Sequence, residues 1–98
     1  MRNAKSVDDI IKELVVGFAR KQKLVDAVYQ GHLPEHQAPV YFFVTRYKRY
    51  DEKLTDAITD LDLKIYRKTK AEFNLIRWPI NPKNAKNSEF LEECLYEK

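Results

Sequence analysis

The stretch from Val40 to Tyr47 (VYFFVTRY) is the feature that most restricts how this chain folds. It is rich in aromatic and β-branched residues, which favour extended strands. Its hydrophobicity is nearly continuous, as in a central strand that is covered on both faces. Pro34 and Pro39 precede it and prevent regular structure over residues 32–39. We therefore expect a strand over residues 40–47 in the middle of a sheet.

The composition is that of one small folded domain spanning residues 1–98. Hydrophobic residues make up 44% of the chain and charged residues 34%, which excludes a disordered chain. The single Cys excludes an internal disulfide and a Cys-rich zinc module, and a free thiol favours the reducing cytoplasm. Acidic residues interrupt the N-terminal apolar stretch, so we expect neither a signal peptide nor a membrane partner.

The N-terminal third predicts one long helix over residues 7–30. Ser6 and Asp9 have the spacing of a helix cap, and Gly31 provides the stop. Gly17 weakens the middle of this helix by roughly 1 kcal/mol relative to Ala, and it indicates either a close packing contact or a bend. The apolar positions recur at helical spacing: Val7, Ile10, Ile11, Leu14, Val15, Phe18, Val25 and Val28.

Residues 51–78 can be interpreted in two ways. In the first, a helix over 51–60 is followed by a hairpin of strands 61–67 and 71–78, because both segments alternate and pair through Lys68-Thr69-Lys70. In the second, a helix continues through residue 67, with Leu54, Ile58, Leu61 and Ile65 in one stripe. The hairpin is favoured because it accounts for both halves, although its turn lacks a Gly or Asn. A short last helix is expected over 88–97, with Phe90, Leu91, Cys94 and Leu95 on its buried side.

These elements predict a small α+β domain with the order α-β-α-β-β-α. A three-stranded mixed sheet (40–47, 61–67 and 71–78) is covered by helices 7–30, 51–60 and 88–97. So small a sheet leaves open edges, which makes a homodimer possible. In the alternative, a mostly α-helical chain pairs its one strand across a dimer.

Charge is segregated along the chain. Seven basic residues and one acidic residue give residues 63–86 a formal charge of +6, whereas residues 51–62 carry −4 and residues 87–98 carry −3. Two basic clusters are interleaved with aromatic residues, at 46–50 and at 66–70. A right-handed crossover makes strands 40–47 and 61–67 parallel, so both clusters are expected at the same sheet edge. The expected nucleic-acid-binding residues are Arg46, Tyr47, Lys48, Arg49, Tyr50, Tyr66, Arg67, Lys68, Lys70, Arg77 and Trp78.

Two short strings have the residue types of metal enzymes. His32-Leu-Pro-Glu-His36 has the order of inverted zinc peptidases, but Gly31 and Pro34 oppose the helix that this site needs. Asp62-Leu-Lys64 has the order of a metal-dependent nuclease strand, but the preceding strand supplies no second acid. The two isolated glycines form no phosphate-binding loop. We therefore predict no catalytic residues, no metal and no cofactor.

The sequence thus favours a non-enzymatic nucleic-acid-binding or regulatory module that uses the basic clusters at 46–50 and 66–70. The alternative is a protein-interaction module, such as an adaptor, inhibitor or antitoxin-like partner, that uses the aromatic side chains of Tyr41, Tyr47, Tyr50 and Trp78. A small metal-dependent nuclease is a distant third hypothesis.

Overall fold

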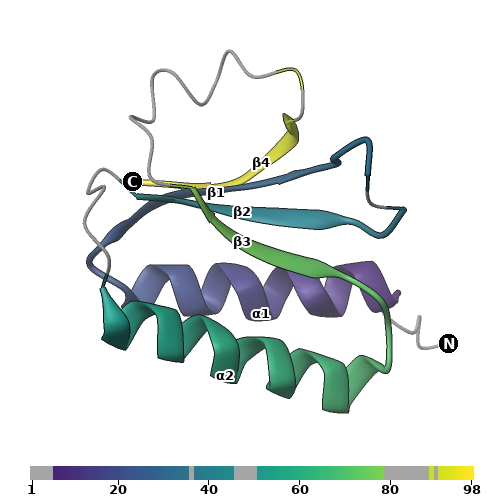
Figure 1. Cartoon of the computed structure of the whole chain (residues 1–98), viewed down its shortest axis with the longest axis horizontal. Coiled ribbons are helices and arrows are strands. Elements are labelled where there is room, and N and C mark those ends of the chain that lie inside the picture. Colours follow the sequence, from purple (N-terminus) through teal and green to yellow (C-terminus); the bar gives the residue numbers. More distant parts are fainter. Residues whose placement is uncertain (1–5, 36, 46–50, 79–88, 90) are drawn as a thin grey trace, which may run out of the picture.

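The computed structural model describes residues 6–35, 37–45, 51–78, 89 and 91–98. Within them the elements follow the order α-β-β-α-β-β, and both helices lie on one face of the sheet (Figure 1). The elements are α1 (Val7–Lys21), β1 (Val25–Gly31), β2 (Val40–Thr45), α2 (Glu52–Thr69), β3 (Asn74–Trp78) and β4 (Leu91–Glu97).

The four described strands form one mixed sheet in the order β3-β2-β1-β4. β1 pairs antiparallel with both β2 and β4, and β2 pairs parallel with β3, from Val40 opposite Asn74 to Val44 opposite Trp78. All six residues of β2 are buried, which confirms the predicted central strand covered on both faces. A parallel pair needs a crossover connection, and α2 lies in the chain between β2 and β3.

The predicted class, α+β, is confirmed, but the order α-β-α-β-β-α and the three-stranded sheet are wrong. Residues 25–30 of the helix predicted over 7–30 and residues 91–97 of the helix predicted over 88–97 are strands, and the strand predicted over 61–67 is helical. The mostly α-helical alternative is wrong as well, because β2 finds two partner strands within the chain.

Helix α1 begins where the sequence predicts and ends nine residues earlier. The Ser6 side chain accepts a hydrogen bond from the Asp9 backbone N–H at 3.1 Å. After Lys21 the chain turns into β1, whose pairing with β2 has an irregularity between Val25 and Ala27. Because of this irregularity, Val25 and Val28, three residues apart, both pack into the core between the sheet and the helices. Ala27 packs into the cluster on the other face of the sheet. The three-residue spacing of Val25 and Val28, which predicted a helix, therefore arises from a β-bulge.

Helix α2 replaces the predicted hairpin strand over 61–67. The Asp51 carboxylate accepts a hydrogen bond from the Leu54 N–H at 2.7 Å and caps the helix. The stripe Leu54, Ile58, Leu61 and Ile65 is buried, whereas Leu63 is 48% exposed. The hairpin required Leu63 to face inward, so this side chain decides between the two interpretations. Of the strand predicted over 71–78, residues 74–78 are strand and form β3.

Strand β4 replaces the predicted last helix. Its pairing with β1 is irregular at two places, so Leu91 packs on one face of the sheet while Leu95 packs on the other. The spacing of these two residues had suggested one helical stripe. Cys94, predicted to be buried, is exposed, and Phe90 lies outside the described residues.

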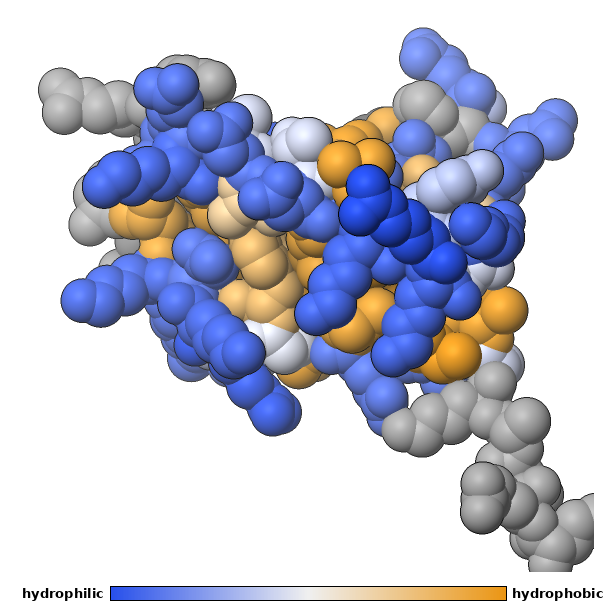
Figure 2. All heavy atoms as spheres, turned by 90° about the horizontal axis from the view of Figure 1, so that it is seen from below, coloured by the Kyte–Doolittle hydropathy of each residue, from blue (hydrophilic) through white to orange (hydrophobic). Residues whose placement is uncertain are grey.

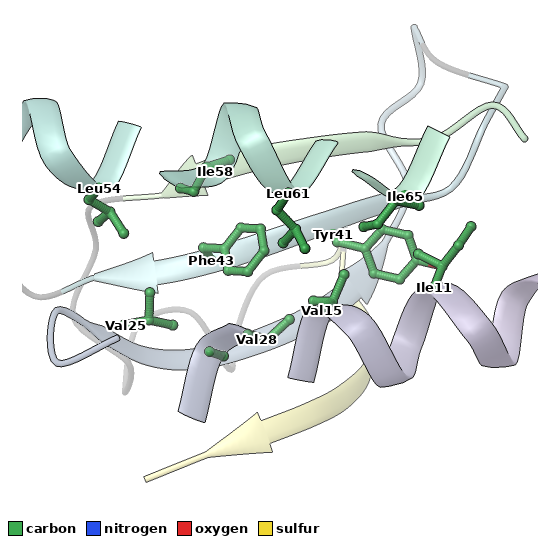
Figure 3. Packing of buried hydrophobic residues seen from close by; sticks show 11 residues of the cluster. Ile11, Val15, Val25, Val28, Tyr41, Phe43, Leu54, Ile58, Leu61 and Ile65 are labelled. Atoms are coloured by element: carbon green, nitrogen blue, oxygen red, sulfur yellow. The ribbon is translucent and has the colours of Figure 1, made fainter. Parts of the chain in front are cut away.

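The main core fills the space between the sheet and the two helices, where Tyr41 and Phe43 of β2 meet Ile11 and Val15 of α1 and the buried stripe of α2 (Figure 3). The Phe18 and Phe43 rings meet edge to face, with centroids 5.6 Å apart. A second cluster on the opposite face contains Ala27, Tyr29 and Val44, with Trp78 and Leu91 packed against it. The outer face of the two helices is mostly hydrophilic around an apolar strip (Figure 2).

Tyr41 is the main-core residue that carries an unsatisfied polar atom. Its side chain is fully buried, and its hydroxyl has no hydrogen-bond partner within the described part of the chain. Burial, reinforced by the negative charges of Asp8 and Glu93, raises the pKa of Tyr41 to about 12. The folded chain therefore resists ionisation of this hydroxyl more than the unfolded chain does.

We predict that Tyr41→Phe stabilises the fold by about 1 kcal/mol near neutral pH, because it removes a buried polar group without a partner and keeps the ring. Since the folded pKa of Tyr41 exceeds the unfolded value of 10.0, the wild type loses stability as the pH rises from about 10 to 12. Denaturant unfolding across this window measures both effects. The Tyr41→Phe variant should show a flatter alkaline loss, and an unchanged loss would contradict the assignment.

Candidate nucleic-acid interface

The predicted nucleic-acid-binding residues fall into three groups. Arg46, Tyr47, Lys48, Arg49 and Tyr50 lie outside the described residues. Tyr66, Arg67, Lys68 and Lys70 lie at the C-terminal end of α2, and Arg77 and Trp78 lie at the end of β3.

The C-terminal end of α2 carries a dense positive charge. Lys64, Arg67 and Lys68 follow one side of the helix at spacings of three and four residues, and Lys70 follows directly after the last turn. All four side chains are exposed. Among the residues that the structure describes, none of the four has a carboxylate within ion-pair distance. We call these four residues together with Tyr66 the α2 basic end.

Tyr66 is the aromatic residue of the α2 basic end. It is 52% exposed, and the Lys70 ammonium lies 5.5 Å from the centre of its ring. This cation–π contact holds Lys70 beside one part of the ring while the rest faces solvent. A flat, accessible ring next to unneutralised cations is the arrangement that stacks on a base and binds its phosphate.

Lys70 stops α2 in a left-handed conformation, with φ of 57°. Its N–H donates to the Tyr66 carbonyl at 2.7 Å, and the Thr69 hydroxyl donates to the Ile65 carbonyl at 2.9 Å. Gly or Asn is the usual residue at such a position, because a Cβ strains the left-handed backbone. The sequence showed that the segment lacked both residue types, and the structure shows that a lysine takes their place.

A hollow of about 490 Å³ adjoins Tyr66. Its walls include Tyr66 itself, the amide of Asn74 and three carboxylates, from Glu35, Asp62 and Glu72. Burial raises the pKa of the Asp62 carboxyl. The exposed ring of Tyr66 therefore has cations nearby in the chain and hydrogen-bond acceptors in the adjoining hollow.

Arg77 and Trp78 are not part of the α2 basic end. β3 pairs with β2 from its start at Asn74 to its end at Trp78, so Arg77 and Trp78 lie opposite Phe43 and Val44, where the parallel pairing ends. The Arg77 Nε donates to the Thr45 hydroxyl at 3.4 Å, and the Trp78 ring packs 5.4 Å from Phe42. Both side chains are half-buried.

The structure removes the reason for expecting the basic clusters at 46–50 and 66–70 to lie at the same sheet edge. That arrangement required the segment 61–67 to be a strand parallel to 40–47, but that segment is helical. α2 starts after Thr45, where β2 ends, and returns the chain to the start of β3, which lies beside the start of β2. Lys70 and Thr45 are therefore at opposite ends of the parallel pair. The cluster at 46–50 itself lies outside the described residues.

The two metal-enzyme strings lack the local structure they require. His32 lies in the connection between β1 and β2, and its Nδ1 is 2.5 Å from the Glu92 carboxylate of β4; His36 lies outside the described residues. Asp62 and Lys64 lie on α2 rather than on a strand, and residues two apart on a helix do not face each other. Within the described residues, no three potential metal ligands come together.

The aromatic side chains predicted for protein interaction do not form the exposed surface that was expected. Tyr41 was expected to be exposed, and it is fully buried in the main core. Trp78 is half-buried, and Tyr47 and Tyr50 lie outside the described residues. Neither described helix combines the length and the apolarity that a membrane span needs.

Sequence reasoning missed Lys64 as a member of the basic end. It was assigned to the strand over 61–67, whereas Lys68 was assigned to the hairpin turn, so the two were not expected to lie side by side. On a helix, the spacing of Lys64, Arg67 and Lys68 places the three side chains next to each other. The helical stripe of Leu54, Ile58, Leu61 and Ile65 was the signal that could have revealed this.

Comparison with known proteins adds no relative: no family model, no curated protein and no solved structure matches this chain. What the site can bind is therefore inferred from its own residues alone.

We predict that Lys70→Gly raises the free energy of unfolding by about 1 kcal/mol, because Gly adopts the left-handed backbone without strain. Lys70→Ala serves as the matched control, since it removes the same charge and ring contact but keeps a Cβ. Thermal unfolding of both variants makes the comparison. Equal stability of the two variants would show that this position is not strained.

Proposed function

We propose that this protein is a non-enzymatic module that binds single-stranded nucleic acid through the α2 basic end. The observation that carries the proposal is a group of four exposed cations at the C-terminal end of α2, one of which, Lys70, lies beside the exposed ring of Tyr66; none has a carboxylate partner among the described residues. Such cations attract phosphates and release condensed counterions when they bind them.

The ring of Tyr66 favours single strands over duplexes. Bases in a duplex are stacked on each other, whereas an unpaired base can stack on an exposed aromatic side chain. A base placed on Tyr66 has the hollow beside it, where carboxylates and an amide can accept hydrogen bonds from its exocyclic amino group. Its phosphate would lie on the side of Lys70 and Arg67.

The strained backbone at Lys70 supports the same proposal. Gly would end α2 without strain, so a lysine at this position makes the fold less stable. The contacts that Lys70 makes within the described chain do not explain why a lysine stands there. Strain of this kind is concentrated at functional sites. A cation fixed beside the Tyr66 ring is what the strained residue supplies.

We predict that the double variant Arg67→Gln/Lys68→Gln binds a single-stranded oligonucleotide with a weaker salt dependence. The slope of log K against log salt should shrink by about 1.4, or roughly 0.7 for each cation removed. Fluorescence anisotropy over a salt series measures it. Lys23→Gln/Lys53→Gln removes two exposed cations elsewhere and should leave the slope unchanged.

Tyr66→Ala separates stacking from charge. It should weaken single-strand binding about 5- to 150-fold, as expected for loss of one base–aromatic stack of roughly 1–3 kcal/mol, with little effect on duplex binding. A third variant, Arg46→Gln/Lys48→Gln/Arg49→Gln, tests the other basic cluster. The proposal fails if the wild type does not bind oligonucleotide at low salt. It also fails if only this third variant loses binding.

A further inference from the structure

The outer face of the helical layer contains an apolar groove between α1 and α2. Its volume is about 410 Å³, and Figure 2 shows the strip of hydrophobic side chains in it, flanked by hydrophilic ones. Leu14, Gly17 and Phe18 of α1 line one side, and Ala57 and Leu61 of α2 line the other. A second, smaller hollow of about 350 Å³ lies on the other side of α1 and shares Glu13 and Gly17.

Gly17 forms a low point in the middle of α1, between these two hollows. A Cβ built there meets nothing within 4 Å, so no contact within the described chain explains why the position has no side chain. Gly in the interior of a helix is less favourable than Ala by roughly 1 kcal/mol. The predicted bend is not needed to explain it either, because α1 is one continuous helix from Val7 to Lys21. A close approach from outside the chain accounts for the missing side chain.

Besides Asp60 and Lys64 of α2, the groove is lined by two charged residues of α1, one on each side of Gly17. Glu13 lies four residues before Gly17 and Lys21 lies four residues after it, and both line the groove. If a second α1 crosses the first in antiparallel orientation at Gly17, Glu13 of each helix faces Lys21 of the other. The surface is thus complementary to itself, as the interface of a two-fold dimer must be.

We propose that the protein forms a homodimer in which two α1 helices cross in antiparallel orientation at Gly17. The missing side chain lets the helix backbones come close, as small residues do at tight helix crossings. Leu14 and Phe18, which are half-buried in the single chain, gain apolar cover from the partner helix. Opposite charges fix the antiparallel orientation, since a parallel pair would set Glu13 against Glu13. This interface differs from the open sheet edges at which the sequence suggested a dimer.

Sedimentation equilibrium over a range of concentrations tests the proposal. The wild type should approach twice the chain mass of 11.7 kDa. Gly17→Leu should weaken the dimer at least tenfold, because the added side chain meets its own copy at the crossing point. The single chain tolerates this change, since the space around Gly17 is open. Thermal unfolding at low concentration confirms that the variant is folded.

Charge reversals give a sharper test. Glu13→Lys alone and Lys21→Glu alone should each weaken self-association at least tenfold, because like charges then face each other. An equimolar mixture of the two variants should regain dimers, as heterodimers, since each chain now carries the charges that complement the other. Lys68→Glu, which lies outside the groove, is the matched control and should sediment like the wild type.

Each outcome distinguishes this proposal from the nucleic-acid proposal. A chain that stays at 11.7 kDa at high concentration, or a dimer that Gly17→Leu leaves unchanged, overturns the α1 interface. Failure of the mixed charge variants to associate overturns the antiparallel geometry. Oligonucleotide binding is measured with Arg67 and Lys68 variants, neither of which lines the groove, so either proposal can fail alone.

Discussion

The burial of β2 on both of its faces is the constraint on which the rest of this structure depends. Tyr41 and Phe43 point toward the helices, while Val44 belongs to the cluster on the opposite face. A strand with no exposed residue cannot lie at the edge of a sheet, so it needs a partner on each side. β1 satisfies one side through an antiparallel pairing, and β3 satisfies the other through a parallel pairing. The parallel pairing in turn requires a crossover connection, which places α2 on the sheet beside α1.

The sequence predicts an element of this fold correctly where the spacing of its hydrophobic residues fits only a helix or only a strand. This holds at β2 and at the start of α1, and the sequence predicts both correctly. At β1 the three-residue spacing of Val25 and Val28 is typical of a helix, yet it arises here from a pairing irregularity. At Leu61 and Ile65 the four-residue spacing fits a strand as well as a helix, and only the exposure of Leu63 separates the two. Such ambiguities are resolved by long-range pairing, which a local pattern does not contain.

The candidate site could also be predicted only in part. The residue types of the basic cluster at 66–70 could be identified from the sequence, because charge and aromatic content do not depend on secondary structure. Its neighbours could not, because they follow from the backbone: a helix brings Lys64 next to Lys68, and a left-handed stop brings Lys70 next to the Tyr66 ring. The predicted association with 46–50 relied on a strand over 61–67, which is helical, so the proposed binding rests on the α2 basic end alone.

The charges of α2 are arranged along the helix, and the helix dipole explains only part of this arrangement. Cations in the last turn of a helix and acids in the first turn stabilise it, which accounts for Arg67, Lys68 and Glu52. The effect fades within one turn of each end, so it does not account for Lys64, which lies in the turn before. Nor does it account for the exposure of Tyr66, since an aromatic ring gains nothing from the dipole. The proposed surface for phosphates and bases would account for both residues, because Lys64 adds a cation next to Lys68 and Tyr66 provides a ring on which a base can stack.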